Sequence, residues 1–269
     1  MADGVPGALS PEERAARASS FGGAAAHYDR YRQGPPAAAV EWILPERVHT
    51  AVDLGAGTGR LSRLLLDRAE AVVAVEPDER MRAVIEAGVP GVRAVPGRGE
   101  SIPLPDASAD AVVASSSWHW MDPVPTEREV ARVLVPGGTL AALWSGPDPE
   151  APFMAQARAL LGAQSGPTHQ ELARALEERS TPAPALEIAP GLPFDDPEHT
   201  VIRWDVALTA DELVGLLGTF SWVILREGDT RARLFETARR LLRDALGVEG
   251  DVTVDVGYRA EAFKTRRQR

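Results

Sequence analysis

The sequence contains no cysteine among its 269 residues. Disulfide bonds, a thiol nucleophile and a cysteine-ligated metal site are therefore excluded. Its five histidines also lack the H-x-x-x-H spacing that is typical of a histidine metal site. We expect no metal cofactor, so the chemistry of this protein must depend on other residue types.

Positive charge is scarce, because 29 lysines and arginines face 39 acidic residues and leave a net charge of −10. Proteins bind the phosphate backbone of nucleic acids with a basic surface. The negative net charge therefore argues against a nucleic-acid partner. Long apolar runs are also missing, since none approaches the ~20 residues that span a bilayer. The first residues lack the basic and apolar regions of a signal peptide. We therefore expect a cytoplasmic protein with no membrane partner, and the oligomeric state stays open.

The stretch over residues 50–60 holds the most informative pattern. An apolar run over 50–54 is typical of a buried strand, and leucines at helical spacing follow from Leu61. Between them lie three glycines at alternate positions, which are Gly55, Gly57 and Gly59. A strand, a glycine turn and a helix together bring backbone N–H groups and a helix N-terminus against a ligand. The pattern therefore predicts a ligand site at this turn.

An acidic residue ends the next predicted strand. Residues 71–75 form a short apolar, β-branched run that Glu76 follows, and Glu76 lies about 20 positions after Gly55. A carboxylate at this spacing is placed to accept hydrogen bonds from ribose hydroxyls. The first half of the chain therefore favours a cofactor that carries a nucleoside.

Strand and helix patterns alternate through the first half of the chain. We expect strands over 50–54, 71–75, 92–95, 110–114 and 139–144, and helices over 58–68, 78–87 and 126–134. The last of these helices would begin at a capping box formed by Thr126 and Glu129. This alternation predicts an α/β fold with a doubly wound, mostly parallel sheet of seven strands. Ligands of such sheets lie outside the carboxyl ends of the strands.

The glycine turn differs from that of a dinucleotide site. It reads Asp-x-Gly-x-Gly-x-Gly from Asp53, and a carboxylate before the first glycine suits a cation better than a pyrophosphate. This run resembles motif I of the class I S-adenosylmethionine-dependent methyltransferases. Segments 97–110, 117–122 and 132–141 resemble later motifs of the small-molecule branch, in the expected order. A weaker resemblance to the trans-aconitate-methyltransferase-like group covers the flanks.

The resemblance implies a Rossmann-like fold and S-adenosylmethionine as the cofactor. Asp53 would anchor the amino group of the cofactor, Glu76 the ribose, and Met81 would pack on the adenine. The position at which relatives often carry an acid for the adenine amino group holds Arg98, so the backbone at Gly99 and Glu100 would serve instead. The remaining expected cofactor contacts are the turn residues Gly55, Ala56, Gly57 and Thr58, Ser116 after the fourth strand, and Tyr28 and Arg32 at the rim.

Two tryptophans and a histidine follow the fourth predicted strand, where the activated methyl group should point. Trp118 and Trp120 could shape an apolar pocket for the acceptor substrate. His119 between them is either a general base or a packing residue. Methyl transfer from a sulfonium does not itself require a base, and a carboxylate acceptor would favour an arginine partner, for which Arg32 is the candidate. We expect a small-molecule acceptor and favour O- or carboxyl-methylation.

The rest of the chain fits a single methyltransferase domain over 1–269. Residues 1–45 would form a helical cover, with a first helix capped at Ser10, and 46–145 the cofactor-binding core. The proline-rich stretch 146–200, with helices over 153–161 and 170–179, would be a cap insertion over the substrate. Residues 201–269 would supply an antiparallel pair of strands, and Thr209 with Glu212 a capping box between them. Two alternatives stay open, an NAD-dependent oxidoreductase and a non-methylating protein that binds S-adenosylmethionine.

Overall fold

The structure is a computed structural model that describes residues 25–178, 184–224, 226 and 228–269. The helix expected after Ser10 lies outside the described residues. Within the described ranges, no helix is long and apolar enough to cross a membrane.

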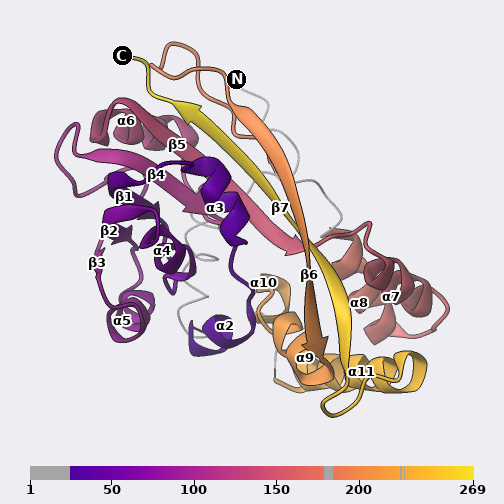
Figure 1. Cartoon of the computed structure of the whole chain (residues 1–269). Helices are drawn as coiled ribbons and strands as arrows, with labels where there is room; N and C mark the ends of the chain where they lie inside the picture. The colour runs from indigo at the N-terminus through magenta and orange to yellow at the C-terminus, as the bar shows by residue number, and fades with distance from the viewer. Residues whose placement is uncertain (1–24, 179–183, 225, 227) are drawn as a thin grey trace, which may run out of the picture.

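A seven-stranded sheet with the order β3-β2-β1-β4-β5-β7-β6 forms the centre of the molecule (Figure 1). The first five strands pair in parallel, and β7 runs antiparallel between β5 and β6. This confirms the doubly wound α/β fold with an antiparallel last strand. The strands are β1 (Val48–Leu54), β2 (Ala69–Val75), β3 (Val92–Val95), β4 (Ala109–Ser115), β5 (Leu134–Pro147), β6 (Glu198–Thr209) and β7 (Thr253–Arg266).

The helices fall mostly where the sequence predicts them. They are α2 (Ala25–Tyr31), α3 (Ala37–Ile43), α4 (Arg60–Leu65), α5 (Glu79–Gly88), α6 (Pro123–Val133), α7 (Pro152–Gly162), α8 (Pro167–Glu178), α9 (Ala210–Leu217), α10 (Ser221–Ile224) and α11 (Gly228–Leu246), with a short 3₁₀ helix over Trp118–Trp120. The capping box at Thr209 is present, because its side chain and that of Glu212 each accept a hydrogen bond from the other residue's backbone N–H.

The start of α6 corrects one expectation. The helix begins at Pro123 after Asp122, one turn before the predicted capping box. Thr126 is therefore inside the helix and fully buried, and its hydroxyl does not cap the helix N-terminus. An N-cap aspartate followed by proline is itself a helix-start signal, and it prevails over the later one.

Apolar side chains from both faces of the sheet are buried, which explains why the central strands read as continuous apolar runs. Val52, Val112 and Leu140 pack on one face with residues of α6. Ala51, Val113 and Leu143 pack on the other face with residues of α3 and α4. The packed core therefore reaches the carboxyl ends of β1 and β4, where the predicted site lies.

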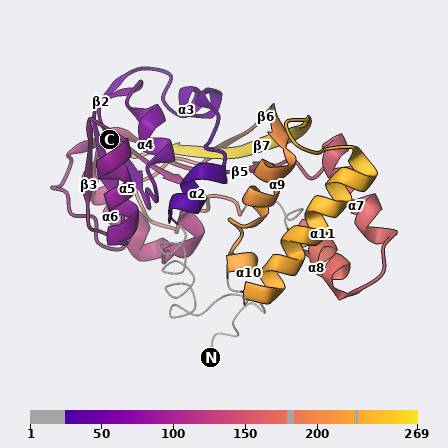
Figure 2. The same cartoon turned by 90° about the horizontal axis from the view of Figure 1, so that it is seen from below.

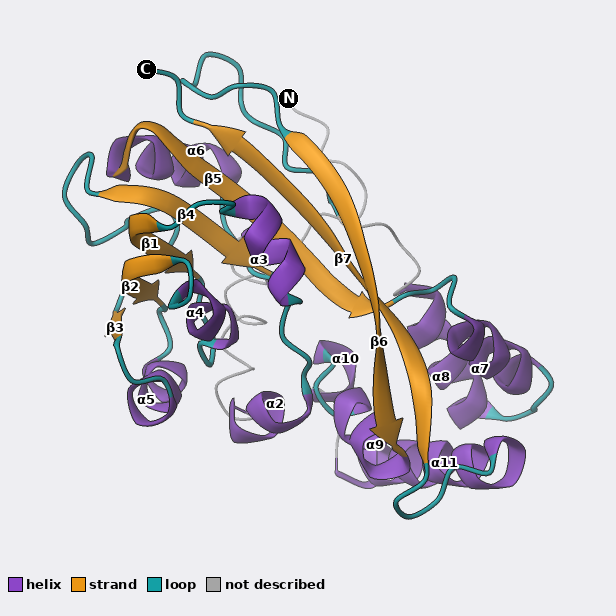
Figure 3. Cartoon of the chain, in the orientation of Figure 1, coloured by secondary structure: helices purple, strands orange, loops and turns teal. Residues whose placement is uncertain are grey.

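Three long strands carry the sheet beyond this core. In Figure 3, β5, β7 and β6 extend from the parallel strands to a group of helices at the other end of the molecule. We call α7, α8, α9 and α11 the helical lobe. Its apolar side chains form clusters of their own, which include Leu234 and Leu242 of α11 and extend to Phe220 in the turn after α9.

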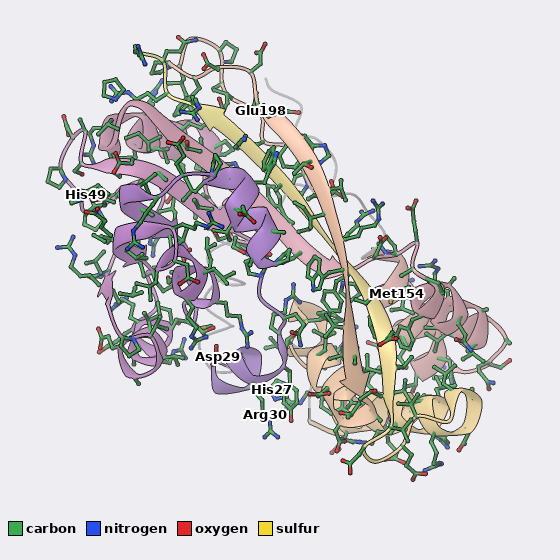
Figure 4. All side chains as sticks on the ribbon, viewed as in Figure 1. His27, Asp29, Arg30, His49, Met154 and Glu198 are labelled. Carbon is green, nitrogen blue, oxygen red and sulfur yellow. The ribbon has the colours of Figure 1, made fainter. Side chains whose placement is uncertain are left out.

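Helix α2 lies between the core and the helical lobe (Figures 1 and 2). Towards the core, Asp29 is 3.6 Å from Nε of Arg60 and 3.5 Å from Nη1 of Arg63. Towards the lobe, the ring nitrogen Nε2 of His27 is 3.0 Å from the carbonyl oxygen of Gly215 in α9. Figure 4 labels His27 and Asp29 on this short helix. The helix thus connects the two parts through polar contacts on both sides.

Gly215 allows this close approach, because a Cβ there would lie 2.3 Å from Cδ1 of Tyr31 in α2. We therefore expect Gly215→Ala to lower the free energy of unfolding by about 1–3 kcal/mol, as overpacking does, despite the better helix propensity of alanine. Urea denaturation of the whole chain measures this change. Adding Tyr31→Ala should recover part of the loss. The matched control is Gly162→Ala at the end of α7, where a Cβ meets nothing within 4 Å, and a loss there as large as at Gly215 would contradict the packing argument.

Candidate functional site

The glycine turn leaves β1 beside the end of β4, where the order of the sheet changes direction. The hydroxyl of Ser117, after β4, donates a hydrogen bond of 2.6 Å to the carbonyl oxygen of Leu54. Gly55 has a φ of +70°, and a Cβ there would lie 2.6 Å from Cβ of Ser117. The contact between the two strand ends therefore requires a residue without a side chain.

The space beside Gly57 is open. Its φ is +57°, and a Cβ added there would meet no atom within 4 Å. Gly59, by contrast, is packed against Ile85 of α5 and Val89 just after it. The turn is therefore held from behind by the core and is bare on its outer side, which is the shape that a ligand cradle needs. Ala56 and Thr58 flank this open side, and Thr58 is buried with a hydroxyl that has no hydrogen-bond partner.

Glu76 points at the glycine turn from the end of β2. Its Oε2 accepts a hydrogen bond of 2.9 Å from the N–H of Gly57, and its Oε1 accepts one of 2.9 Å from the N–H of Asp78. Burial raises the pKa of the Glu76 carboxyl above its ordinary value, and these two N–H groups offset part of that rise. Each carboxylate oxygen has a second lone pair, so the group can also accept hydrogen bonds from a diol.

Asp53 lies under the same turn and is 1% exposed. Its Oδ2 accepts a hydrogen bond of 2.6 Å from the hydroxyl of Ser62, whereas its Oδ1 is buried and has no partner. Burial, opposed by the Ser62 hydrogen bond and helped by the charge of Glu76, raises the pKa of Asp53 to about 7. A buried carboxylate oxygen without a partner is costly, and an added cation or N–H donor would satisfy it.

The residues expected near the adenine follow Glu76 in the chain. Met81 is buried in α5, and Gly99 and Glu100 form the two-residue turn between the bridged residues Arg98 and Ser101. A Cβ on Gly99 would lie 2.6 Å from the sulfur of Met121, so this backbone is tightly packed. The carboxylate of Glu100 accepts a hydrogen bond of 2.7 Å from the N–H of Asp122 at the start of α6. Glu100 therefore has a structural role, which leaves its backbone as the group that can face a ligand.

The residues after β4 form the other wall. Ser116 has a φ of +54°, a strained conformation for a residue with a side chain, and such strain is common at functional sites. Trp118 is 7% exposed and packs in the core under the sheet. Trp120 is half-buried, with its ring centroid 4.5 Å from that of His119. Of the two tryptophans, Trp120 therefore offers the larger accessible surface.

The hydrogen bonding of His119 fixes its tautomer. The indole Nε1–H of Trp144 in β5 donates a hydrogen bond of 3.0 Å to Nδ1 of His119. An indole N–H can only donate, so Nδ1 is the acceptor and the neutral ring carries its proton on Nε2. Desolvation by the surrounding atoms, followed by the nearby charge of Arg32, lowers the pKa of His119 to about 4, although the residue as a whole is exposed. At neutral pH His119 therefore presents an N–H donor rather than a basic lone pair.

Arg32 connects this histidine to the helical lobe. Its guanidinium carbon is 5.6 Å from the ring centroid of Phe220, and its charge acts on His119. Tyr28 lies in α2, and the position of its side chain is outside what the structure describes. The sequence analysis did not select Trp144 or Phe220 as site residues. The signal available for Trp144 was a tryptophan at the carboxyl end of a parallel strand. The signal available for Phe220 was its place in 218–222, which resembles a Thr-aromatic-Ser turn of the same methyltransferase group.

The tautomer of His119 can be tested without an acceptor substrate. We expect NMR of ring-¹⁵N-labelled protein to show the Nε2–H tautomer and no titration of His119 between pH 6 and pH 8. Trp144→Phe removes the donor to Nδ1, so both tautomers should then be populated. A midpoint near pH 6.5 for His119 in the unsubstituted protein would contradict the assignment.

Among the described residues, no group of three or more histidine, cysteine, aspartate or glutamate side chains is placed to hold a metal ion. The site brings together two carboxylates, a glycine turn, a histidine and an arginine.

Comparison with known proteins agrees with the geometry. Residues 52–142 match the methyltransferase domain family. An uncharacterised methyltransferase of Mycobacterium bovis is 34% identical over 223 residues, which cover 83% of this chain and 85% of that protein. A malonyl-[acyl-carrier protein] O-methyltransferase of Enterobacter lignolyticus is 33% identical over 137 residues, which cover 49% of this chain and 55% of that protein. The solved structure of a proposed type II methyltransferase from Anaeromyxobacter dehalogenans has a TM-score of 0.54 and 26% identity, and the match covers 88% of this chain and 98% of that one.

Proposed function

This chain belongs to the class I S-adenosylmethionine-dependent methyltransferases, and from that premise we propose that it transfers a methyl group from S-adenosylmethionine to an oxygen atom of a small-molecule acceptor. Residues 46–145 would hold the cofactor, residues 1–45 would cover it, and the insertion over 146–200 would close over the acceptor.

The observation that carries the proposal is the pair of buried carboxylates at one glycine turn. Asp53 has a buried oxygen without a partner, which suits the ammonium group of the methionine part of the cofactor. Glu76 lies at the end of the neighbouring strand with lone pairs for the two ribose hydroxyls. The open side of Gly57 gives the space between them. A pyrophosphate would instead meet two negative groups, which disfavours an NAD-dependent oxidoreductase.

The bound cofactor would supply an electrophilic methyl group on a sulfonium, which needs alignment more than activation. An acceptor oxygen donates its electron pair to the methyl carbon, the carbon–sulfur bond breaks, and that bond's electron pair stays on sulfur. A carboxylate acceptor loses no proton in this step. His119, as an N–H donor, and Arg32 can orient such a carboxylate, whereas a phenol or an amine would need a base that His119 does not provide.

Two lines therefore support an oxygen acceptor. One is the tautomer of His119, and the other is the relative named as a malonyl-[acyl-carrier protein] O-methyltransferase, although that match covers about half of each protein. The second candidate function, a protein that binds S-adenosylmethionine without methylating, shares the cofactor site and differs only in its lack of turnover.

Calorimetric titration with S-adenosylmethionine, S-adenosylhomocysteine and NAD tests the cofactor. We expect both sulfur compounds to bind at micromolar concentration and NAD not to bind. Tight binding of NAD alone would overturn the proposal. Release of S-adenosylhomocysteine in the presence of a panel of carboxylic acids, phenols and amines then separates a methyltransferase from a non-methylating protein.

A further inference from the structure

A cavity of about 140 Å³ lies inside the helical lobe. Its walls come from α7, α8, α9 and α11 and from the ends of β5 and β7, and every residue that lines it is apolar. Met154, labelled in Figure 4, is one of the α7 residues on this wall. This cavity is partly open to solvent, and apolar cavities of roughly this size bind small hydrocarbons such as benzene. The cavity is therefore suited to a hydrocarbon group of about six carbon atoms.

Phe220 joins this cavity to the candidate methyl-transfer site. It lines the cavity, and the guanidinium of Arg32 lies over its ring. Pro147, the last residue of β5, also lines the cavity, but it lies three residues after Trp144, so the two side chains leave opposite faces of the strand. The charge of Arg32 in turn acts on His119. One end of the cavity therefore lies near the positive charge of Arg32.

We propose that this cavity binds the aliphatic chain of the methyl acceptor, which is an anionic amphiphile whose carboxylate lies beside Arg32 and His119. Charge complementarity favours an anionic amphiphile, because the apolar cavity lies next to the cationic Arg32 on a protein with a net negative charge. The acceptor class is thus a carboxylic acid with a chain of about six to eight carbons. This inference rests on the proposed function, since it names the substrate class for the same site.

Straight-chain carboxylates of different lengths test the inference by direct binding. In calorimetry on the whole chain with saturating S-adenosylhomocysteine, we expect the affinity to rise about fourfold for each added methylene. The rise should level off at about eight carbons, when the cavity is filled. A flat series from butanoate to dodecanoate, with normal binding of S-adenosylhomocysteine, would overturn the inference and leave the proposed function standing. Failure of S-adenosylhomocysteine itself to bind would remove the premise of both.

Substitutions on two different helices fill the cavity independently. Ala157→Leu in α7 and Ala238→Leu in α11 each add three carbons to the lining, and each should weaken octanoate binding at least tenfold without changing the affinity for S-adenosylhomocysteine. The control is Ala155→Leu, which lies on the exposed face of α7. Unchanged octanoate binding in both cavity variants would overturn the inference. If one variant fails to fold, the other and the chain-length series still decide.

The charged end has its own test. Arg32→Gln should weaken octanoate binding about tenfold or more and leave the binding of 1-octanol unchanged, because only the carboxylate needs the guanidinium. Equal losses for the acid and the alcohol would contradict the placement of the carboxylate beside Arg32.

Discussion

Glu76→Gln should weaken the binding of S-adenosylhomocysteine by about 100-fold, which corresponds to about 2.7 kcal/mol. The carboxylate is held by the N–H groups of Gly57 and Asp78 and faces the space in which the ribose would lie. A glutamine has one acceptor oxygen, so its amide would point an N–H group either at one of these donors or at the ribose. Hydrogen bonds to a charged group contribute about 1.5–3 kcal/mol each, so losing one of the ribose bonds accounts for the expected change.

The matched control for this substitution is Glu79→Gln. Glu79 is exposed in the first turn of α5, three residues from Glu76. Its substitution removes the same charge from the same region. Calorimetry should give an affinity within about twofold of the unsubstituted protein for this control, as is usual for exposed substitutions. If both variants bound equally well, the assignment of Glu76 to the ribose would fail.

Asp53→Asn should remove a pH dependence of cofactor binding that the unsubstituted protein shows. Because burial raises the pKa of Asp53 to about 7, the carboxyl is increasingly protonated as the pH falls below that value. A protonated Asp53 cannot pair with an ammonium group, so the affinity for S-adenosylhomocysteine should fall by up to tenfold per pH unit below pH 7. In the asparagine variant we expect weak binding without the part of the pH dependence near pH 7 that Asp53 causes.

Asp53→Asn should also stabilise the cofactor-free protein at high pH. A folded-state pKa above the unfolded value of 3.8 means that the folded state binds more protons between these two values, so Asp53 lowers the stability as the pH rises from about 4 to about 7. Asparagine removes that loss, and the free energy of unfolding at pH 8 should rise by an amount on the order of 2–4 kcal/mol. At pH 4 the two proteins should differ little.

Thermal unfolding at pH 4 and pH 8 measures this difference, with Asp67→Asn at an exposed position as the control. A lower melting temperature for Asp53→Asn at pH 8 would show that Asp53 is needed to hold the turn rather than to bind a cation. The combination of gained stability and lost affinity is the specific sign of a buried group kept for its ligand.

Local sequence signals were enough to predict the fold and to bring the glycine turn and Glu76 together. The number of residues between the turn and Glu76 is fixed by one helix and one strand, so the contact of Glu76 with Gly57 follows from the pattern alone. The start of α6 shows the limit of such signals, since Asp122 with Pro123 and Thr126 with Glu129 both fit a helix start, and only the packing of the loop after β4 decides between them.

The residues around the acceptor could not be predicted in the same way. Trp144 meets His119 because of the register between β4 and β5, and Phe220 meets Arg32 because α9 packs on α2 over a distance of nearly two hundred residues in the chain. The cavity of the helical lobe is likewise a property of four helices together. Each of these helices, taken by itself, shows only an ordinary apolar stripe.

The place of β7 between β5 and β6 has a consequence for synthesis on the ribosome. Of the described strands, β7 is made last, and it provides every strand contact that β6 has. Until residues 253–266 leave the exit tunnel, β6 is an unpaired edge and the helices attached to it have no sheet to pack on. The glycine turn and its two acids, in contrast, are complete in the nascent chain long before that. The polypeptide therefore completes the proposed nucleoside-binding half before the proposed acceptor-binding half.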